Sequence, residues 1–272
     1  MRALLTNDDG AHAPGLAALH QAVHDLFDDV LVVAPLTVQS ATSHGITYAD
    51  PIMTTEVRIE QFGHAFDAIA VDGRPADCTK LALSTLWPAR FGRNTRPDLV
   101  ISGMNMGANV GINVIYSGTV AAAIEAAFLG VPAIAVSQHL GKGVADYPAA
   151  ATHARRAIEK LLDGLGRERL EAHEMININI PRCEFDDDDR HEPTPITVCP
   201  MNTHAVNDRY ERRESPAGDA YYWSTSDGMD FAHADEGTDV ELLLRRHITV
   251  TPLTYDLTRR SRMDRMKQAI DG

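Results

Sequence analysis

The first 35 residues constrain the fold more strongly than any other part of the chain. Residues 2–6 form an apolar stretch that predicts a buried strand, and residues 7–14 form a polar loop after it. Pro14 can open a helix, since proline fits the first helical turn. Apolar residues then recur at helical spacing, at Leu16, Leu19, Val23 and Leu26. The apolar stretch 29–35 predicts a second strand, so the segment has the pattern of a βαβ unit with parallel strands.

The same alternation of strand and helix continues to about residue 182. Further strands are predicted at 97–102, 133–137 and 175–181, and further helices at 76–86, 119–129 and 146–165. Only the section 45–70 is less regular, with short alternating stretches. The pattern predicts an α/β fold in which residues 1–182 form a Rossmann-like, three-layer core with a mostly parallel sheet.

The composition changes beyond residue 182. An acidic run at 186–189 precedes a segment with the β-like stretches 221–223 and 248–253, and a short helix is expected at the C-terminus. We therefore place a boundary at 182/183 within what is otherwise a single unit. Residues 183–272 are expected to form a β-rich arm with a terminal helix, and the arm to pair with another subunit.

Composition excludes several classes of partner. The net charge of −13 argues against binding to duplex nucleic acid or to an anionic membrane, because both need clustered lysine and arginine. No run of about 18 apolar residues is present, and the chain starts directly in a strand, so we expect a cytoplasmic protein without a signal peptide. Cys78, Cys183 and Cys199 lack zinc-binding spacing and are expected to be reduced thiols.

Two adjacent carboxylates, Asp8 and Asp9, follow the first predicted strand. Ligands collect at the carboxyl ends of strands in open α/β sheets, and two carboxylates at one place repel unless a cation lies between them. On its own the pair fits two interpretations equally well: a metal site, or a helix cap together with a turn carboxylate. Oxygen-bearing loops at other strand ends, at 39–40, 102–113 and 117–119, favour a site for Mg²⁺ or Mn²⁺.

Ser117, Gly118 and Thr119 precede a predicted alanine-rich helix. Alone they indicate an ordinary helix cap, and the Gly/Asn-rich loop before them indicates an irregular turn. The N-terminus of a helix also binds phosphate through its free N–H groups and its dipole. A cation on one side and this helix start on the other would form a phosphoryl site.

Five sequence motifs resemble those of the stationary-phase survival protein SurE family, in the same order. The motifs are Thr6-Asn7-Asp8-Asp9-Gly10 with His12-Ala13-Pro14-Gly15, Val33-Ala34-Pro35 with Gln39-Ser40, Pro75-Ala76-Asp77-Cys78, the stretch Asp98 to Asn109, and Tyr116-Ser117-Gly118-Thr119-Val120. Downstream, Ile178-Asn179-Ile180-Pro181, Tyr221-Tyr222-Trp223 and Val250-Thr251-Pro252-Leu253 are also similar, so the resemblance covers nearly the whole chain.

The resemblance implies a divalent-metal-dependent phosphatase, a 5′-nucleotidase that hydrolyses nucleoside 5′- and 3′-monophosphates. It implies one Mg²⁺ or Mn²⁺ per subunit and a homodimer or homotetramer built through the C-terminal arm. Matched motif by motif, the metal ligands would be Asp8, Asp9, Ser40 and Asn105. By the same resemblance, the residues near the phosphate would be Asn109, Ser117, Gly118 and Thr119.

The reaction expected from these residues is attack by a metal-activated water, with Asp8 and Asp9 as the catalytic carboxylates and Asp9 as proton acceptor. Direct attack by an aspartate is the alternative, but the loop with Asp8 and Asp9 lacks the DxD pattern of phosphatases that use it. His12 and His44 are candidate proton donors, although a structural role is expected for each.

A function of another class is a nucleotide-binding regulatory module without catalysis. The chain has no GxGxxG pattern and no Walker A lysine, which argues against dinucleotide and P-loop binding.

Overall fold

The computed structural model describes residues 1–165, 170, 173–192, 194–226 and 228–271. Its strands are β1 (Arg2–Thr6), β2 (Asp29–Pro35), β3 (Met53–Gln61), β4 (His64–Asp72), β5 (Leu99–Met106), β6 (Ala133–Gln138), β7 (Met175–Ile180), β8 (Ile196–Val198), β9 (Tyr210–Glu214), β10 (Ala220–Ser224) and β11 (Ile248–Leu253). Its α-helices are α1 (Pro14–Val23), α2 (Pro75–Leu81), α3 (Trp87–Phe91), α4 (Gly118–Phe128), α5 (Tyr147–Leu165), α6 (Asp239–Leu244) and α7 (Met263–Asp271). Shorter helical segments are η1 (His24–Leu26), η2 (Ala82–Leu86), η3 (Gly111–Ile115) and η4 (Arg260–Arg262).

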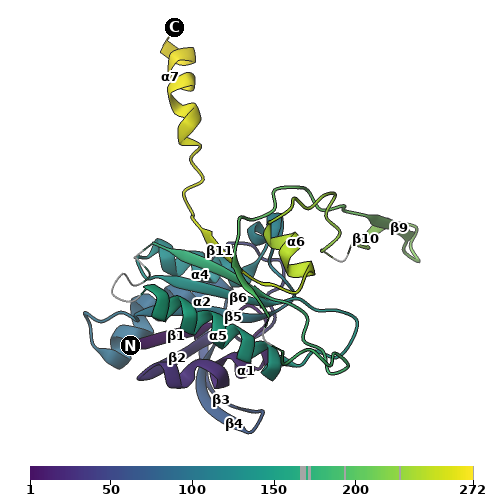
Figure 1. The fold of residues 1–272 in the computed structure, drawn as a ribbon. Helices are drawn as coiled ribbons and strands as arrows, with labels where there is room; N and C mark the ends of the chain where they lie inside the picture. The colour runs from purple at the N-terminus through teal and green to yellow at the C-terminus, as the bar shows by residue number, and fades with distance from the viewer. Residues whose placement is uncertain (166–169, 171–172, 193, 227, 272) are drawn as a thin grey trace.

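The core has three layers around one nine-stranded sheet of order β3-β4-β2-β1-β5-β6-β7-β11-β8 (Figure 1). Helices α1 and α5 cover one face, and α2 and α4 cover the other. Successive residues of β1 therefore enter different cores, Leu5 packing toward α1 and Leu4 toward α2 and α4. A strand buried on both faces needs a continuous apolar run, as seen in β1 and β2. The predicted α/β, mostly parallel fold is confirmed.

The chain changes direction across the sheet beside β1. After β1 it builds β2 and the strands beyond, and it then returns to place β5 on the other side of β1, with both neighbours parallel to β1. Such a switch point opens a crevice at the carboxyl ends of the two central strands. Helix α1 lies close to this crevice because Gly15 has no side chain: a Cβ there would sit 2.1 Å from the carbonyl oxygen of Met104.

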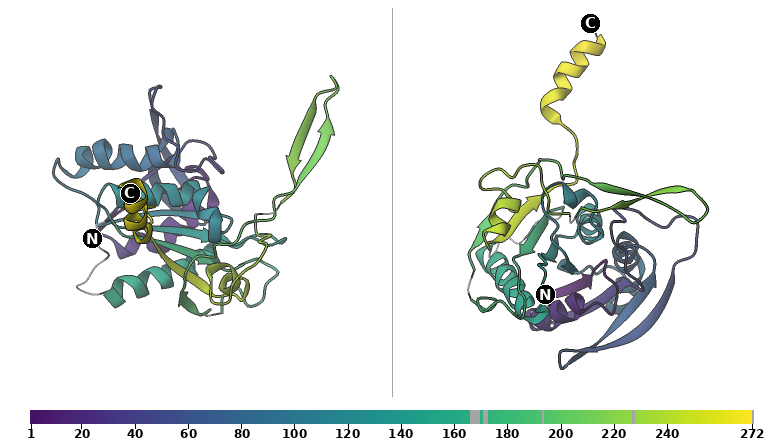
Figure 2. Two further views of the ribbon diagram at one scale, coloured as in Figure 1. Left: turned by 90° about the horizontal axis from the view of Figure 1, so that it is seen from above. Right: turned by 90° about the vertical axis from the view of Figure 1, so that its right-hand side faces the viewer.

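The section 45–70, expected to be irregular, contains most of a long hairpin. Strands β3 and β4 pair antiparallel from Met53 opposite Asp72 to Gln61 opposite His64, and β4 joins the main sheet beside β2. The hairpin extends beyond the helical layers (Figure 2). Most side chains of β3 are exposed, so the alternation of apolar and polar residues in its sequence is limited to a short stretch.

The segment 183–272 contributes to two sheets. Strand β11 lies antiparallel to β7 and parallel to β8. Strands β8 and β11 therefore belong to the main sheet, although they follow the predicted boundary at 182/183. The boundary itself stays a prediction. Strands β9 and β10 form a separate hairpin, and α7 projects away from the core (Figure 2). The three cysteines are buried and free, as predicted.

Within the described part of the chain, no helix combines the length and apolar character needed to cross a membrane.

Candidate metal and phosphate site

The four predicted metal ligands line one cavity of about 240 Å³ at the carboxyl ends of the central strands. Asp8 and Asp9 follow β1, Ser40 lies in the loop after β2, and Asn105 lies near the end of β5. The cavity is completed by Ala41, Met106, Gly107, Ala108, Asn109, Asn113, Tyr116 and Ser117. Residues separated by about a hundred positions in the sequence thus meet at the switch point of the sheet.

Asp8 is buried, with 5% of its surface exposed. The hydroxyl of Thr119 donates to its Oδ1 at 2.5 Å, and the N–H of Gln39 donates to its backbone oxygen at 2.8 Å. Burial raises the pKa of Asp8 to about 6, the Thr119 hydrogen bond opposes this rise, and the charge of Asp9 adds to it. The Asp8 carboxylate is therefore held in position by hydrogen bonds, but its negative charge is not balanced by a positive charge on any described neighbour.

Asp9 receives a hydrogen bond from the N–H of Met106 to its Oδ2 at 2.8 Å. Burial also raises the pKa of Asp9 above its usual value, and this hydrogen bond opposes the rise. Among the described residues, no lysine or arginine contributes to the pKa of either carboxyl. Two adjacent carboxylates in a partly buried cavity fit a divalent cation, which would supply the missing positive charge.

Ser40 and Asn105 add a hydroxyl and an amide to the two carboxylates. Ser40 is exposed and Asn105 is half-buried. The amide nitrogen of Asn105 donates to the carbonyl oxygen of Gly107 at 2.6 Å, which holds the side chain in place and makes its oxygen the atom offered to a ligand. Carboxylate, hydroxyl and amide oxygens are the donors that hard cations such as Mg²⁺ and Mn²⁺ prefer.

The N-terminus of α4 packs directly against Asp8. The Ser117 hydroxyl caps the helix by accepting the N–H of Val120 at 3.1 Å. A Cβ at position 118 would lie 2.8 Å from Asp8 Cβ and 2.9 Å from its Oδ2, so only glycine permits this approach. Of the predicted phosphate residues, Ser117 and Asn109 line the cavity, whereas the Thr119 side chain is turned to Asp8.

A buried amide network holds Asn109. Its N–H donates to Asn179 Oδ1 at 2.8 Å, its Nδ2 donates to Ser137 Oγ at 2.8 Å, and its carbonyl oxygen accepts from Asn177 Nδ2 at 2.7 Å. The sequence interpretation missed these partners in β6 and β7. The sequence does contain an indication of them, because two polar residues, Asn177 and Asn179, interrupt an otherwise apolar strand. This strand is buried at every position.

The side chain of His44 has the partners expected of a structural residue, whereas the structural role of His12 stays a prediction. His44 Nε2 lies 2.8 Å from Glu125 Oε2, and Lys80 pairs with the other oxygen of Glu125 at 2.9 Å. His12 is exposed, and its carbonyl oxygen accepts from Gln61 Nε2 at 2.9 Å. Neither histidine lines the cavity.

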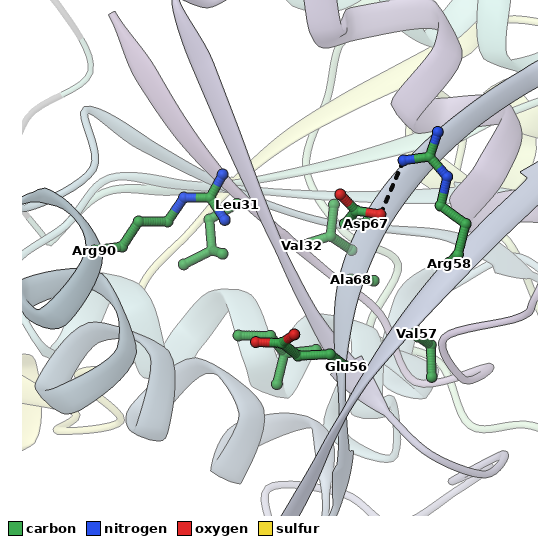
Figure 3. A pocket seen from close by; sticks show the side chains of 9 residues that line it. Leu31, Val32, Glu56, Val57, Arg58, Asp67, Ala68 and Arg90 are labelled. Atoms are coloured by element: carbon green, nitrogen blue, oxygen red, sulfur yellow. Dashed lines mark hydrogen bonds and ion pairs between the residues drawn. The ribbon is translucent and has the colours of Figure 1, made fainter.

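A second hollow of about 390 Å³ lies elsewhere on the sheet, between β2, the β3–β4 hairpin and Arg90 of α3 (Figure 3). Arg58 and Asp67 form an ion pair at 2.9 Å beside it. None of the predicted site residues lines this hollow. The carboxylate cavity is therefore the candidate site although it is the smaller of the two.

Comparisons with known proteins identify the family of the chain. The family model for "Survival protein SurE" matches residues 3–208. A protein named 5′-nucleotidase SurE from Rhodopirellula baltica is 42% identical over 267 residues, which are 98% of this chain and 98% of that protein. Another of the same name, from Desulforudis audaxviator, is 38% identical over 271 residues, covering 98% of this chain and 97% of its own.

The similarity extends to three dimensions. The crystal structure of the SurE protein from Aquifex aeolicus superimposes with a TM-score of 0.78 at 32% identity, over 99% of each chain. Sequence and structure agree over almost the full length. The chain therefore belongs to the survival protein SurE family.

Proposed function

We propose that this protein is a divalent-metal-dependent phosphatase, a 5′-nucleotidase that hydrolyses nucleoside 5′- and 3′-monophosphates to nucleoside and phosphate. The observation that carries the proposal is the convergence of Asp8, Asp9, Ser40 and Asn105 on one cavity with Asn109 and Ser117. The names of the relatives, 5′-nucleotidase SurE, support the same reaction.

In this proposal Asp8, Asp9, Ser40 and Asn105 hold one Mg²⁺ or Mn²⁺ per subunit. When bound, the ion supplies positive charge to the phosphoryl oxygens and lowers the pKa of a water molecule. Thr119 positions the Asp8 carboxylate, because its hydroxyl donates to Oδ1. The N–H of Met106 positions Asp9 in the same way through Oδ2.

The phosphoryl group is proposed to lie between these carboxylates and the start of α4. Asn109, Ser117 and the N–H group of Gly118 bind its oxygens, aided by the helix dipole. Thr119 lies near the phosphate and holds Asp8 through its hydroxyl and its backbone. Asp9 accepts the proton of the attacking water. We favour water over attack by an aspartate because both carboxylates are hydrogen-bonded and oriented as ligands.

An apolar cavity of about 580 Å³ next to the phosphoryl site offers a place for the nucleoside. Ser117 lines both cavities, and the larger one is bounded mainly by apolar side chains, among them Ile115, Ile124 and Phe128. With its base and ribose in this apolar cavity, a nucleotide would have its phosphate in the adjoining cavity beside Asp8 and Asp9.

A non-catalytic nucleotide-binding module is the competing function. The complete set of oxygen ligands argues against it, because binding alone does not need two uncompensated carboxylates.

We further propose a cytoplasmic homodimer or homotetramer assembled through the C-terminal arm.

The deciding experiment measures phosphate release from 5′-AMP, 3′-AMP and phenyl phosphate with Mn²⁺, with Mg²⁺ and with a chelator. We expect metal-dependent release that is faster for the nucleotides than for phenyl phosphate. Asp9→Asn should abolish turnover while the circular dichroism spectrum stays unchanged, because it removes the proton acceptor and a charged ligand. Asp163→Asn, an exposed change on α5, is the matched control. Nucleotide binding without metal-dependent release would support the module instead.

Acid quench of a single turnover with ³²P-labelled 5′-AMP separates the two routes of attack. Direct attack by water forms no bond between phosphorus and the protein, so we expect no ³²P on the protein at any time. Transient ³²P on an aspartate would show that the enzyme passes through an aspartyl-phosphate.

A further inference from the structure

Three histidines from three elements lie together outside the carboxylate cavity. His20 lies near the C-terminal end of α1, His24 begins η1 one turn later, and His64 begins β4. One ring nitrogen of each lies within 4.8 Å of the others. Among the described residues, the other such group is His204, His233 and Asp235, whose members are largely exposed.

The His20 ring is fixed on two sides. Its Nδ1 lies 2.9 Å from His64 Nε2, and the ring stacks on Phe66 with centroids 3.9 Å apart and planes 12° apart. His20 is 6% exposed and His64 is half-buried, so two of the three rings are held by packing. A site with ordered ligands needs little rearrangement to bind an ion.

His24 offers a free nitrogen. Its Nδ1 lies 3.0 Å from the carbonyl oxygen of Gln21, and a carbonyl can only accept, so Nδ1 carries the hydrogen. The lone pair is then on Nε2. Metal-binding histidines typically have this pattern, with one nitrogen on the metal and the other donating to a carbonyl or carboxylate.

We propose that His20, His24 and His64 form a second metal site, for a late first-row divalent ion such as Zn²⁺. Imidazole nitrogen suits Zn²⁺, Cu²⁺ and Ni²⁺, in contrast to the oxygen ligands of the carboxylate cavity. Nitrogens bound to one tetrahedral Zn²⁺ lie about 3.3–3.4 Å apart, given Zn–N bonds of about 2.0–2.1 Å. The ring nitrogens of all three pairs lie at most 4.8 Å apart, and a bound ion would replace the 2.9 Å hydrogen bond between His20 Nδ1 and His64 Nε2. Three nitrogens leave the fourth position to water.

An ion at this place would join α1 to the tip of the β3–β4 hairpin. The two elements already touch there, because Gln21 Nε2 donates to the carbonyl oxygen of Phe62 at 3.3 Å. Gln61 Nε2 donates to the carbonyl oxygen of His12, in the loop that leads from the carboxylates to α1. The site would therefore stabilise the hairpin against the core at a distance from the reaction.

The test is a Zn²⁺ titration by calorimetry of the untagged full chain, with excess Mg²⁺ present to compete for the carboxylate cavity. We expect Zn²⁺ to bind and to raise the melting temperature. His24→Gln should lower the Zn²⁺ affinity by about 10-fold or more, on the scale seen when metal-site residues are altered. His24 is exposed, so this variant should fold, and His64→Gln should have the same effect.

His204→Gln in the exposed group is the matched control and should leave the affinity unchanged. Substitution of Co²⁺ gives a second readout, because the visible absorption of tetrahedral Co²⁺ should be lost in His24→Gln. Zn²⁺ binding that is equal in the wild type and in His24→Gln would overturn the proposal. Binding lost only in Asp9→Asn would place the ion in the carboxylate cavity and would overturn it equally. Because each readout is binding, the test is independent of nucleotidase activity.

Discussion

At the scale of single residues, the carboxylates of the site are oriented by neutral donors. Asp8 receives the Thr119 hydroxyl and Asp9 receives the Met106 N–H. Neutral donors fix the direction of a carboxylate and leave its charge for a ligand, whereas an arginine partner would neutralise it. Thr119 is therefore a positioning residue.

Thr119→Val should weaken Mn²⁺ binding by about 10- to 100-fold, the usual effect of removing a hydrogen-bond partner of a metal ligand. The shape of the side chain is kept, but Asp8 loses the hydroxyl donor and keeps only its backbone hydrogen bonds. Thr119→Ser keeps the hydroxyl and should retain affinity close to that of the wild type. The measurement is a Mn²⁺ titration followed by electron paramagnetic resonance. Equal affinity in Thr119→Val and the wild type would remove Thr119 from the metal site.

His153 of α5 should make the folded state sensitive to acid. It is buried, its Nε2 lies 2.7 Å from the carbonyl oxygen of Arg190, and burial lowers its pKa below 6.5. The hydrogen bond opposes this shift, while Arg156, His191 and Arg246 add to it. Below a pH of about 6.5, His153 is therefore protonated in the unfolded chain but stays neutral in the folded chain. The free energy of unfolding then falls by up to about 1.4 kcal/mol per pH unit.

Urea denaturation at pH 7.5 and pH 5.5 measures this effect. His153→Gln keeps a donor for the carbonyl oxygen but cannot take up the proton, so its stability should depend less on pH than that of the wild type. An unchanged pH dependence would show that His153 does not contribute.

The sequence singled out Asp8 and Asp9 because two adjacent aspartates after a strand fit a cation site as well as a helix cap, and the oxygen-bearing loops at other strand ends favoured the cation. Ser40 was selected only by resemblance, since nearby hydroxyls are equivalent in the sequence. The contact between Thr119 and Asp8 could not be predicted, because it joins side chains 111 positions apart and depends on the orientation of both.

At the scale of elements, β7 supports the site although none of its residues lines the cavity. Its two asparagines bind the backbone of Asn109. Asn179 Oδ1 accepts from the Asn109 N–H, and Nδ2 of both Asn177 and Asn179 donates to the Asn109 carbonyl oxygen. A loop held by a central strand is more rigid than one held by its own contacts.

Asn179→Ala should destabilise the fold and loosen this loop. The N–H of Asn109 would be left buried without its acceptor, which costs about 1–3 kcal/mol. We expect a lower urea midpoint and a lower kcat/KM for 5′-AMP. Asn207→Ala, which removes an exposed amide contact, should change neither. A normal midpoint in Asn179→Ala would mean that water replaces the lost acceptor.

Elements buried on both faces were predicted well, and exposed ones poorly. Strands β1, β2 and β6 are apolar runs that local composition reveals. The predicted helix 76–86 is divided between α2 and η2, and α3 continues to Phe91. The position of β11 beside β7 is a pairing between distant segments, which no local pattern specifies.

At the scale of the whole molecule, apolar side chains gather on the C-terminal arm. Tyr210, Tyr221, Tyr222 and Trp223 are exposed on the β9–β10 hairpin, and Met263, Met266 and Ile270 are exposed on α7. Aromatic residues on a projecting hairpin are typical of an interface between subunits. The arm is therefore the surface on which we expect assembly.

Replacing Tyr222 and Trp223 together by serine should reduce the molar mass in solution, measured by light scattering after size-exclusion chromatography. Buried aromatic residues dominate interface energies, so their loss should dissociate the oligomer. Both are about 60% exposed in the single chain, at 62% and 60%, so the fold should persist. Tyr48→Ser, at an exposed tyrosine outside the arm, should leave the mass unchanged. An unaltered mass in the double variant would place the interface elsewhere.

The position of β11 also has a consequence for biosynthesis. Strand β7 has its partner on one side only after residues 248–253 have been made. While the ribosome is still adding the intervening segment, β7 presents an unpaired apolar edge, the kind of template on which nascent chains aggregate. The sheet is therefore completed beside β7 only after residues 248–253 have been made.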